Sequence, residues 1–539
     1  MKITKLLSVF LFIAQVSIAQ TREDTLAAIE KIMSQYHAQD PGCQLSVSRN
    51  GQVVFSKAWG MADLELNVPL STNSIFEAGS VSKQFTGAAI LLLEQQGKLL
   101  LDDDVRKYVT ELPDYGTPIT LRQMLHHTSG IKDWGSIAEL TGWPRGKKFY
   151  TNEDALEILT HQKTLNNKPG DEFLYSNSNC NLFGIIVQRV SGLSLAAFTK
   201  KYIFEPAGMT HSQWRNDPDR IVPNRAIAYS KMGDNFKIDM PNEYVYGQGG
   251  LLTTTEDLLK WNDFYLHGKL GTPSLLGKQT LTEPLNNGVM NVYAAGLFIK
   301  QLRGWYNISH NGATASYRCY LDAFPELDLS IAILSNTSQY SINTIAAKVR
   351  NIFVKNKEVK KPKDAAAVNI SAATLNTLAG MYKNERDASA FYLSVKDNQL
   401  ILDGDIPLTT VSETTFQSDN FLLYVKDGKG MYVPFSPRDS MPFTKMAPAY
   451  IAPKDMANYA GRYFSEETNS YITIFEDNGK LIMQLKAGET YLLISTYKDA
   501  FKITDLDCDI EFTRDAQNHI LLMKMYVPRA RNVVFKKVQ

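Results

Sequence analysis

Two similar segments, roughly 80 residues apart, mark the last third of this 539-residue chain. Leu378-Ala379-Gly380-Met381-Tyr382 resembles Tyr459-Ala460-Gly461-Arg462-Tyr463. After each segment come an apolar strand pattern, a turn at Asp397-Asn398 or Asp477-Asn478-Gly479, and a second strand pattern. This repeat predicts two similar small antiparallel β-domains, each a closed or nearly closed, lipocalin-like barrel.

A lysine-rich stretch separates the repeats from the larger N-terminal part of the chain. It contains Pro362 and ends in Ala365–Ala367, so it has little to bury and indicates a linker. Before it, helical patterns (25–36, 81–95, 181–190 and 255–265) mix with strand patterns (43–49, 53–58, 305–309, 317–324 and 329–334). The last two strands flank a turn and predict a hairpin. Because few strands alternate with helices, we expect an α+β fold with an antiparallel sheet flanked by helices.

The N-terminus has the layout of a signal peptide. Lys2 and Lys5 precede the apolar run 6–13, and the small residues Ser17 and Ala19 follow. This layout favours export, to the periplasm in a bacterium or beyond, over a buried N-terminal helix. The predicted division of the chain is therefore 1–19 leader, 20–355 main domain, 356–369 linker, and 370–451 and 452–539 barrel-like domains.

Composition narrows the classes of partner. Charged residues make up 21% of the chain and the formal net charge is +1, so no one-signed field favours nucleic acid or an acidic membrane surface. No segment after the leader has the roughly 18 uninterrupted apolar residues of a membrane span. The four cysteines are far apart and fit no metal-ligand spacing, and we interpret most of them as buried free thiols.

The strongest chemical motif opens the most apolar helix pattern. Ser80 lies at the start of this pattern, and Lys83 projects from the same face one turn later. A serine hydroxyl needs a base to become a nucleophile, and an amine held against an apolar helix loses hydration, which lowers its pKa. Ser-x-x-Lys alone is common and is compatible with an N-cap serine followed by a solvated lysine.

Two further elements could complete a site. Tyr175 and Asn177 follow a Pro169-Gly170 turn, where a loop could point both into one cleft. The tyrosine could share a proton with Ser80 and Lys83, and the asparagine could offer its amide to a substrate carbonyl or to Lys83. Alternatively, Tyr175 is only packed as a hydrophobe. His310, Gly312 and Ala313 end a strand pattern; Gly312 permits close backbone approach, and the Ala313 amide could join that of Ser80 in binding an oxyanion. Alternatively, His310 is only a strand-end histidine.

The order Ser80-x-x-Lys83, Tyr175-x-Asn177, His310-x-Gly312 resembles the serine β-lactamase and penicillin-binding-protein family, on its class C side. The resemblance covers roughly residues 25–350 and implies a β-lactamase/transpeptidase-like fold. Three other stretches also agree with the family, and we interpret them as scaffold: 125–130, 206–210 and 249–254. His126 and His127, in the first of these stretches, are interpreted as non-catalytic.

The resemblance implies a serine hydrolase that forms an acyl-enzyme, with Ser80, Lys83 and Tyr175 catalytic and Asn177, His310, Gly312 and Ala313 binding substrate. No metal or organic cofactor is required. Histidine stands where many members have lysine, and the two C-terminal domains resemble the D-aminopeptidase layout. We therefore expect a small-molecule or peptide substrate, with D-amino-acid peptides or amides first. An esterase, a β-lactamase or carboxypeptidase, and a slowly acylating penicillin-binding sensor remain alternatives.

Overall fold

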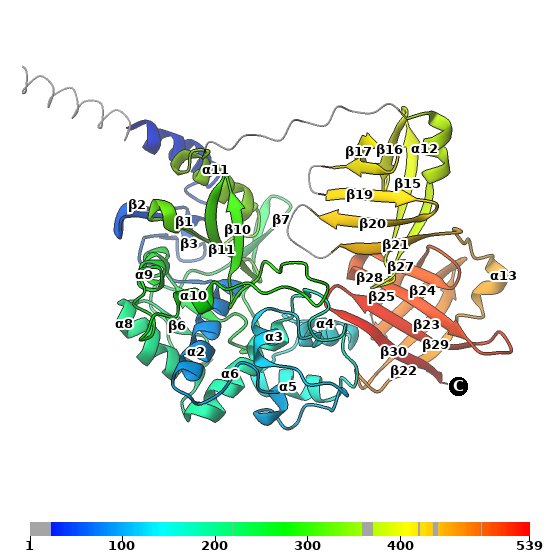
Figure 1. Ribbon diagram of the computed structural model, residues 1–539, viewed down its shortest axis with the longest axis horizontal. Helices are drawn as coiled ribbons and strands as arrows, with labels where there is room; N and C mark the ends of the chain where they lie inside the picture. The colour runs from blue at the N-terminus through cyan, green and yellow to red at the C-terminus, as the bar shows by residue number, and fades with distance from the viewer. Residues whose placement is uncertain are drawn as a thin grey trace, which may run out of the picture.

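The computed structural model describes residues 23–538, except 218, 358–369, 419–420, 435–439 and 487. The predicted leader and nearly all of the predicted linker lie outside the described residues. The described chain forms a large N-terminal α+β part and two β-barrel parts, arranged side by side in Figure 1.

A six-stranded antiparallel sheet organises the N-terminal part, as the strand patterns predicted. Its order is β10 (Phe298–Leu302), β11 (Trp305–Thr314), β12 (Tyr317–Phe324), β13 (Leu329–Ser335), β1 (Cys43–Arg49) and β2 (Gln52–Trp59). β12 and β13 form the expected hairpin. Both faces of β13 are buried: Ile331 and Ile333 pack with the helix 23–33 and α11 (Ile342–Phe353), whereas Ala332 and Leu334 join the main core.

Helices and short strand pairs build the rest of this part. The main core contains α2 (Lys83–Gln95), whose residues 83–93 are all buried, packed against α6 (Asn177–Ser191). The other helices are α3 (Leu121–Leu125), α4 (Trp134–Leu140), α5 (Asn152–Thr160), α7 (Leu195–Thr199), α8 (Glu205–Ala207), α9 (Thr255–Leu266) and α10 (Leu276–Gln279). The small sheets pair β3 (Met61–Asp63) with β4 (Val68–Pro69), β9 (Leu251–Thr253) with β5 (Phe76–Glu77) and β6 (Gln213–Trp214), and β7 (Tyr229–Met232) with β8 (Asn235–Ile238).

The C-terminal third contains the two predicted barrels. After α12 (Ala372–Leu378), the first is a closed eight-stranded barrel: β14 (Gly380–Asn384), β15 (Ala390–Lys396), β16 (Gln399–Leu402), β17 (Ile406–Ser412), β18 (Thr415–Gln417), β19 (Phe421–Lys426), β20 (Lys429–Pro434) and β21 (Met441–Met446). After α13 (Pro453–Met456), the second is a nine-stranded sheet: β22 (Gly461–Ser465), β23 (Ser470–Asp477), β24 (Lys480–Lys486), β25 (Glu489–Leu492), β26 (Ile494–Ser495), β27 (Ala500–Ile503), β28 (Cys508–Arg514), β29 (Ile520–Val527) and β30 (Ala530–Val538). β25 and β26 are its two edges, so the second barrel is nearly closed.

The repeated segment makes the same contacts in both barrels. The Tyr382 hydroxyl donates to the Leu378 carbonyl at 2.7 Å, and the Tyr463 hydroxyl donates to the Tyr459 carbonyl at 2.7 Å. The glycine of each copy has a φ near +145°, where a side chain would be strained. The two tyrosines are fully buried. This shared corner explains why the short motif repeats although the rest of each copy differs.

The second barrel packs directly against the N-terminal part, below the first barrel in Figure 1. Ile137 and Leu140 of α4 belong to the same apolar cluster as the core of this barrel. Lys132 pairs with Glu467 across the interface, and the two side chains are 0% and 11% exposed. The barrel is therefore held by an apolar contact and a buried ion pair, rather than hanging free.

The structure also bears on the cysteines and on membrane-spanning helices. All four cysteines are buried and unpaired, as expected for most of them. Within the described ranges no single helix is long and apolar enough to cross a membrane, and one bent pair, 177–191 with 195–207, passes by length and composition only.

Candidate active site

Ser80 lies on the wall of a cavity of about 720 Å³ between the N-terminal part and the barrels. It is in the 3₁₀ turn Gly79–Ser82, which leads directly into α2. Four other predicted site residues also line this cavity: Tyr175, Asn177, His310 and Ala313. Lys83 and Gly312 lie behind the wall, against Ser80 and its turn.

Lys83 is placed to act on the Ser80 hydroxyl. Its Nζ lies 3.1 Å from Ser80 Oγ and donates a second hydrogen bond, of 2.6 Å, to the carbonyl of Gln248. The side chain is 1% exposed, and burial lowers the pKa of the amine to about 7, aided by the positive charge of Arg529. An amine with this pKa is about half neutral at pH 7, and the neutral form can accept the serine proton.

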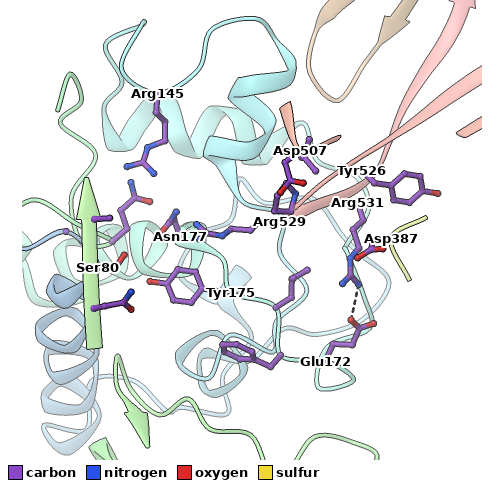
Figure 2. A pocket seen from close by; sticks show the side chains of 18 of the residues that line it. Ser80, Arg145, Glu172, Tyr175, Asn177, Asp387, Asp507, Tyr526, Arg529 and Arg531 are labelled. Carbon is purple, nitrogen blue, oxygen red and sulfur yellow. Dashed lines mark hydrogen bonds and ion pairs between the residues drawn. The ribbon is translucent and has the colours of Figure 1, made fainter. Parts of the chain in front are cut away.

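Tyr175 also lines the cavity, with its hydroxyl directed toward Ser80 (Figure 2). This hydroxyl is buried and makes no hydrogen bond with any residue the structure describes. Burial raises the pKa of Tyr175, so the phenol stays protonated at neutral pH. The ring centre is 4.9 Å from Lys83 Nζ, so the phenol and the amine act on the same side of Ser80.

His127 holds the Tyr175 ring, a role that the sequence did not reveal. The two ring centres are 4.4 Å apart. His127 Nδ1 accepts hydrogen bonds from the Ser176 backbone N–H and the Asn179 side-chain amide. Burial and the charge of Lys83 hold the pKa of His127 well below its ordinary value, so the ring is neutral. The interpretation of this histidine as scaffold agrees with these contacts.

Asn177 lines the cavity from the first turn of α6, not from a loop as predicted. The helix begins four residues earlier than the sequence pattern indicated. Its N-cap, Ser176, gives no side-chain cap; instead, the carboxylate of Asp133 accepts the Asn177 backbone N–H at 2.6 Å. Because that cap comes from a distant segment, the local sequence did not show where the helix starts.

His310 faces the cavity, but both of its ring nitrogens are already bonded. Nδ1 donates to the Asn311 carbonyl at 2.6 Å, so Nε2 must accept from the Tyr293 hydroxyl, 2.9 Å away. Burial, with the charge of Lys83, lowers the pKa of His310 to about 3. The ring is therefore neutral and has no free nitrogen with which to bind a substrate carboxylate.

Gly312 lets β11 press against the nucleophile turn. A methyl group in place of its hydrogen would lie 2.0 Å from the Ala78 carbonyl oxygen and 3.1 Å from the Ser80 nitrogen. Gly79, with φ +52°, approaches the Ala313 nitrogen in the same way. The backbone nitrogens of Ser80 and Ala313 are thus brought to one side of the cavity, the arrangement needed for two oxyanion donors. His310 and Ala313 lie within a strand that is longer than predicted, 305–314.

Residues 28–354 match the family model described as Beta-lactamase. The chain belongs to the beta-lactamase family. Protein flp of Staphylococcus aureus strain MRSA252 is 28% identical over 348 residues, which cover 63% of this chain and 67% of that protein. The matches to other flp proteins span about two thirds of those proteins' length or slightly less.

Solved structures share the fold. The octameric penicillin-binding protein homologue from Pyrococcus abyssi has a TM-score of 0.53 and 26% identity, covering 78% of this chain and 99% of that chain. A D-stereospecific amidohydrolase from a Streptomyces species has a TM-score of 0.52 and 21% identity, covering 61% of this chain and 98% of that chain. The latter likeness concerns the fold alone.

The barrels supply the far side of this beta-lactamase-family cavity. Arg386, Asp387, Ser389 and Met441 come from the first barrel, and residues 526–529, together with Asp507, Asp509 and Arg531, from the second. The β29–β30 loop projects farthest, and its Arg529 reaches toward Tyr175 (Figure 2). No local pattern marks this loop as functional, because its position depends on how the barrel packs. Among the residues described, no group of three His, Cys, Asp or Glu side chains could hold a metal ion.

Proposed function

We propose that this member of the beta-lactamase family hydrolyses amide or ester bonds through an acyl-enzyme on Ser80. The observation that carries the proposal is the buried Lys83 amine, 3.1 Å from Ser80 Oγ, with a pKa lowered to about 7. A lysine in this state is a general base and not a structural cation. A solvated lysine beside an N-cap serine, the alternative from sequence, would be exposed.

The reaction proceeds in two acyl-transfer steps. Lys83 takes the Ser80 proton as Oγ attacks the substrate carbonyl, and the oxyanion is stabilised by the backbone N–H groups of Ser80 and Ala313. Tyr175, whose hydroxyl has no other partner among the described residues, donates the proton that the leaving group needs. The Lys83 ammonium then passes its proton to the Tyr175 oxygen, which restores the neutral amine and the phenol. Water cleaves the ester: Lys83 accepts the water proton as the oxygen attacks the acyl carbon, and that proton returns to Ser80 Oγ when the acid leaves.

We assign D-amino-acid peptides or amides as the substrate class. Three observations support this choice: the neutral His310 at the third motif, the barrels that narrow the cavity, and the shared fold with a D-stereospecific amidohydrolase. Carboxypeptidase or β-lactamase chemistry is less favoured, because these activities commonly use a charged third-motif side chain as a carboxylate anchor. The leader pattern adds the proposal that the protein acts outside the cytoplasm, in the periplasm or beyond.

Initial rates on a substrate panel test the assignment. The panel is D-alanine p-nitroanilide, L-alanine p-nitroanilide, p-nitrophenyl butyrate and nitrocefin, each repeated with Ser80→Ala. Cleavage that depends on Ser80 and is fastest for the D-anilide supports the proposal. Fastest cleavage of the ester or of nitrocefin would replace the substrate class with an esterase or a β-lactamase. Acylation by a penicillin without turnover would indicate a sensor.

A further inference from the structure

Arg529 is the one guanidinium in the cavity that the described residues leave without a carboxylate. The other three arginines that line the cavity are paired: Arg145 with Glu243, and Arg531 and Arg386 with Glu172. Arg529 instead stacks over Tyr175, with Cζ 4.9 Å from the ring centre. Its side chain is half-buried and forms no hydrogen bond or ion pair with the described part of the chain. A half-buried, unpaired cation stacked on the tyrosine that faces the nucleophile points to an anionic ligand.

The backbone of Arg529 is fixed, so the point from which its side chain enters the cavity is set before any ligand arrives. Its carbonyl accepts the Asp133 N–H and the Asn166 side-chain amide, each at 3.0 Å. The following strand is held too, because the Arg531 N–H donates to Asn166 at 2.7 Å. These contacts join the β29–β30 loop to the N-terminal part. Because the loop is already ordered, binding an anion does not have to pay for ordering the backbone.

Two carboxylates near Arg529 could have neutralised it: Glu139, whose pKa burial raises and the charge of Arg529 lowers in part although no ion pair joins them, and Asp133, which is occupied. Its Oδ1 accepts the N–H groups of Gly135 and Ser136, and its Oδ2 accepts that of Asn177. On the opposite wall His310 is neutral, and both its ring nitrogens are used. Because Lys83 serves as the base, Arg529 is the cation left to bind an anionic substrate group beside Ser80.

We infer that Arg529 is a substrate-binding residue that anchors a carboxylate of the substrate next to Ser80. The second barrel thus supplies the positive charge that the third motif on β11 lacks, because His310 is neutral. The substrate is then a peptide or amide that carries a free carboxylate close to the scissile bond. D-amino-acid peptides remain first, and the substrate panel separates them from carboxypeptidase or β-lactam substrates, which also carry such a group. This inference rests on the proposed acylation of Ser80, so its test must separate the two.

Arylboronic acids allow that separation, because boron accepts the Ser80 oxygen whatever the natural substrate is. Inhibition constants of phenylboronic acid and of its meta- and para-carboxy derivatives are measured on the full chain. The variants are Arg529→Gln and Arg529→Lys. The matched control is Arg462→Gln, an exposed arginine of the same barrel that stacks on Tyr471 at 3.7 Å, away from the cavity.

We expect at least one carboxy derivative to bind the unchanged protein about ten-fold or more tightly than phenylboronic acid does. Arg529→Gln should remove this preference, Arg529→Lys should keep part of it, and Arg462→Gln should keep all of it. The inference is overturned if the unchanged protein shows no preference for a carboxy derivative, or if the preference survives in Arg529→Gln. It is also overturned if Arg529→Gln weakens the binding of all the boronic acids equally, because Arg529 would then only support Tyr175. Failure of every boronic acid to bind the unchanged protein would instead contradict the acylation of Ser80, and the inference would fall with it.

Discussion

Lys83 Nζ lies 3.1 Å from Ser80 Oγ, fully buried and without any carboxylate bonded to it. Its one other hydrogen bond is to a backbone carbonyl, that of Gln248. An uncharged acceptor leaves the amine free to lose its proton, whereas a salt bridge would hold it charged. The relationship therefore favours a base at neutral pH.

The rate of Ser80 acylation should follow the protonation of Lys83. Because the neutral amine is the base and its pKa is about 7, kcat/KM should rise with pH through about 7 and then level. Lys83→Met should lose about 10²–10⁴-fold in kcat/KM and should lose the rising limb too. Rates between pH 5 and 9 on the best substrate of the panel measure both. If kcat/KM of Lys83→Met still rises with pH in the same way, the titrating group is not Lys83.

Lys83 should also make the folded protein less stable, and more so at low pH. The folded pKa is about 7 and the unfolded value is 10.5, so below pH 7 both states bind the proton and the penalty for burying the charge is complete. As pH rises from 7 toward 10, this penalty should shrink from roughly 5 kcal/mol toward zero. The gain in unfolding free energy of Lys83→Met should therefore be largest near pH 6 and smallest near pH 10. The unpaired Gln248 carbonyl will reduce the gain at every pH, without altering this trend.

Tyr175→Phe should separate catalysis from stability. The lost hydroxyl has no hydrogen-bond partner among the described residues, and the ring still packs on His127, so the unfolding midpoint should stay the same or rise slightly. kcat should fall about 10²-fold or more, because the leaving group loses its proton donor. Steady-state rates and thermal unfolding, measured on one preparation of each protein, give kcat and the unfolding midpoint. A variant that is less stable but fully active would contradict both the catalytic role of the hydroxyl and its lack of a structural role.

Gly312→Ala should damage both the fold and the site, since the new methyl group would lie 2.0 Å from the Ala78 carbonyl. The strand must move away from the Ser80 turn, which should cost about 1–3 kcal/mol or more and remove most activity. The matched control is Gly277→Ala in α10, where nothing lies within 4 Å of the added methyl. That variant should be at least as stable as the unchanged protein. Equal behaviour of the two variants would mean that the close approach is unimportant.

The Lys132–Glu467 pair should contribute strongly to packing of the second barrel. Glu467→Gln leaves a buried ammonium without its counter-charge, and loss of one partner of such a pair costs about 3–5 kcal/mol. Glu466→Gln is the control: the neighbouring glutamate is exposed and pairs with Lys163 and Lys536, so the change should cost at most about 1 kcal/mol. Denaturant unfolding of both variants gives the comparison, and similar losses would contradict the buried pair's role.

Local patterns predicted much of this architecture. The antiparallel sheet and the two barrels follow from alternation and turn residues within short windows. Ser80 and Lys83 are three residues apart, so their contact is set by one helical turn. The predicted domain boundaries at 355, 369 and 451 remain predictions.

Contacts between distant segments were not predictable. The start of α6 depends on Asp133, more than forty residues away in the chain, and Arg529 reaches Tyr175 only because the second barrel packs on α4. His127 could be recognised as a conformational outlier only in the structure, where its φ is +53°. Such residues carry no local periodicity, and a single sequence cannot show them.

Mass spectrometry of the protein after reaction with a fluorophosphonate is the sharpest test that Ser80 is the nucleophile. We expect one adduct, on the peptide that contains Ser80, formed slowly or not at all in Lys83→Met and absent in Ser80→Ala. An adduct on another residue, or equal labelling of Ser80→Ala, would contradict it.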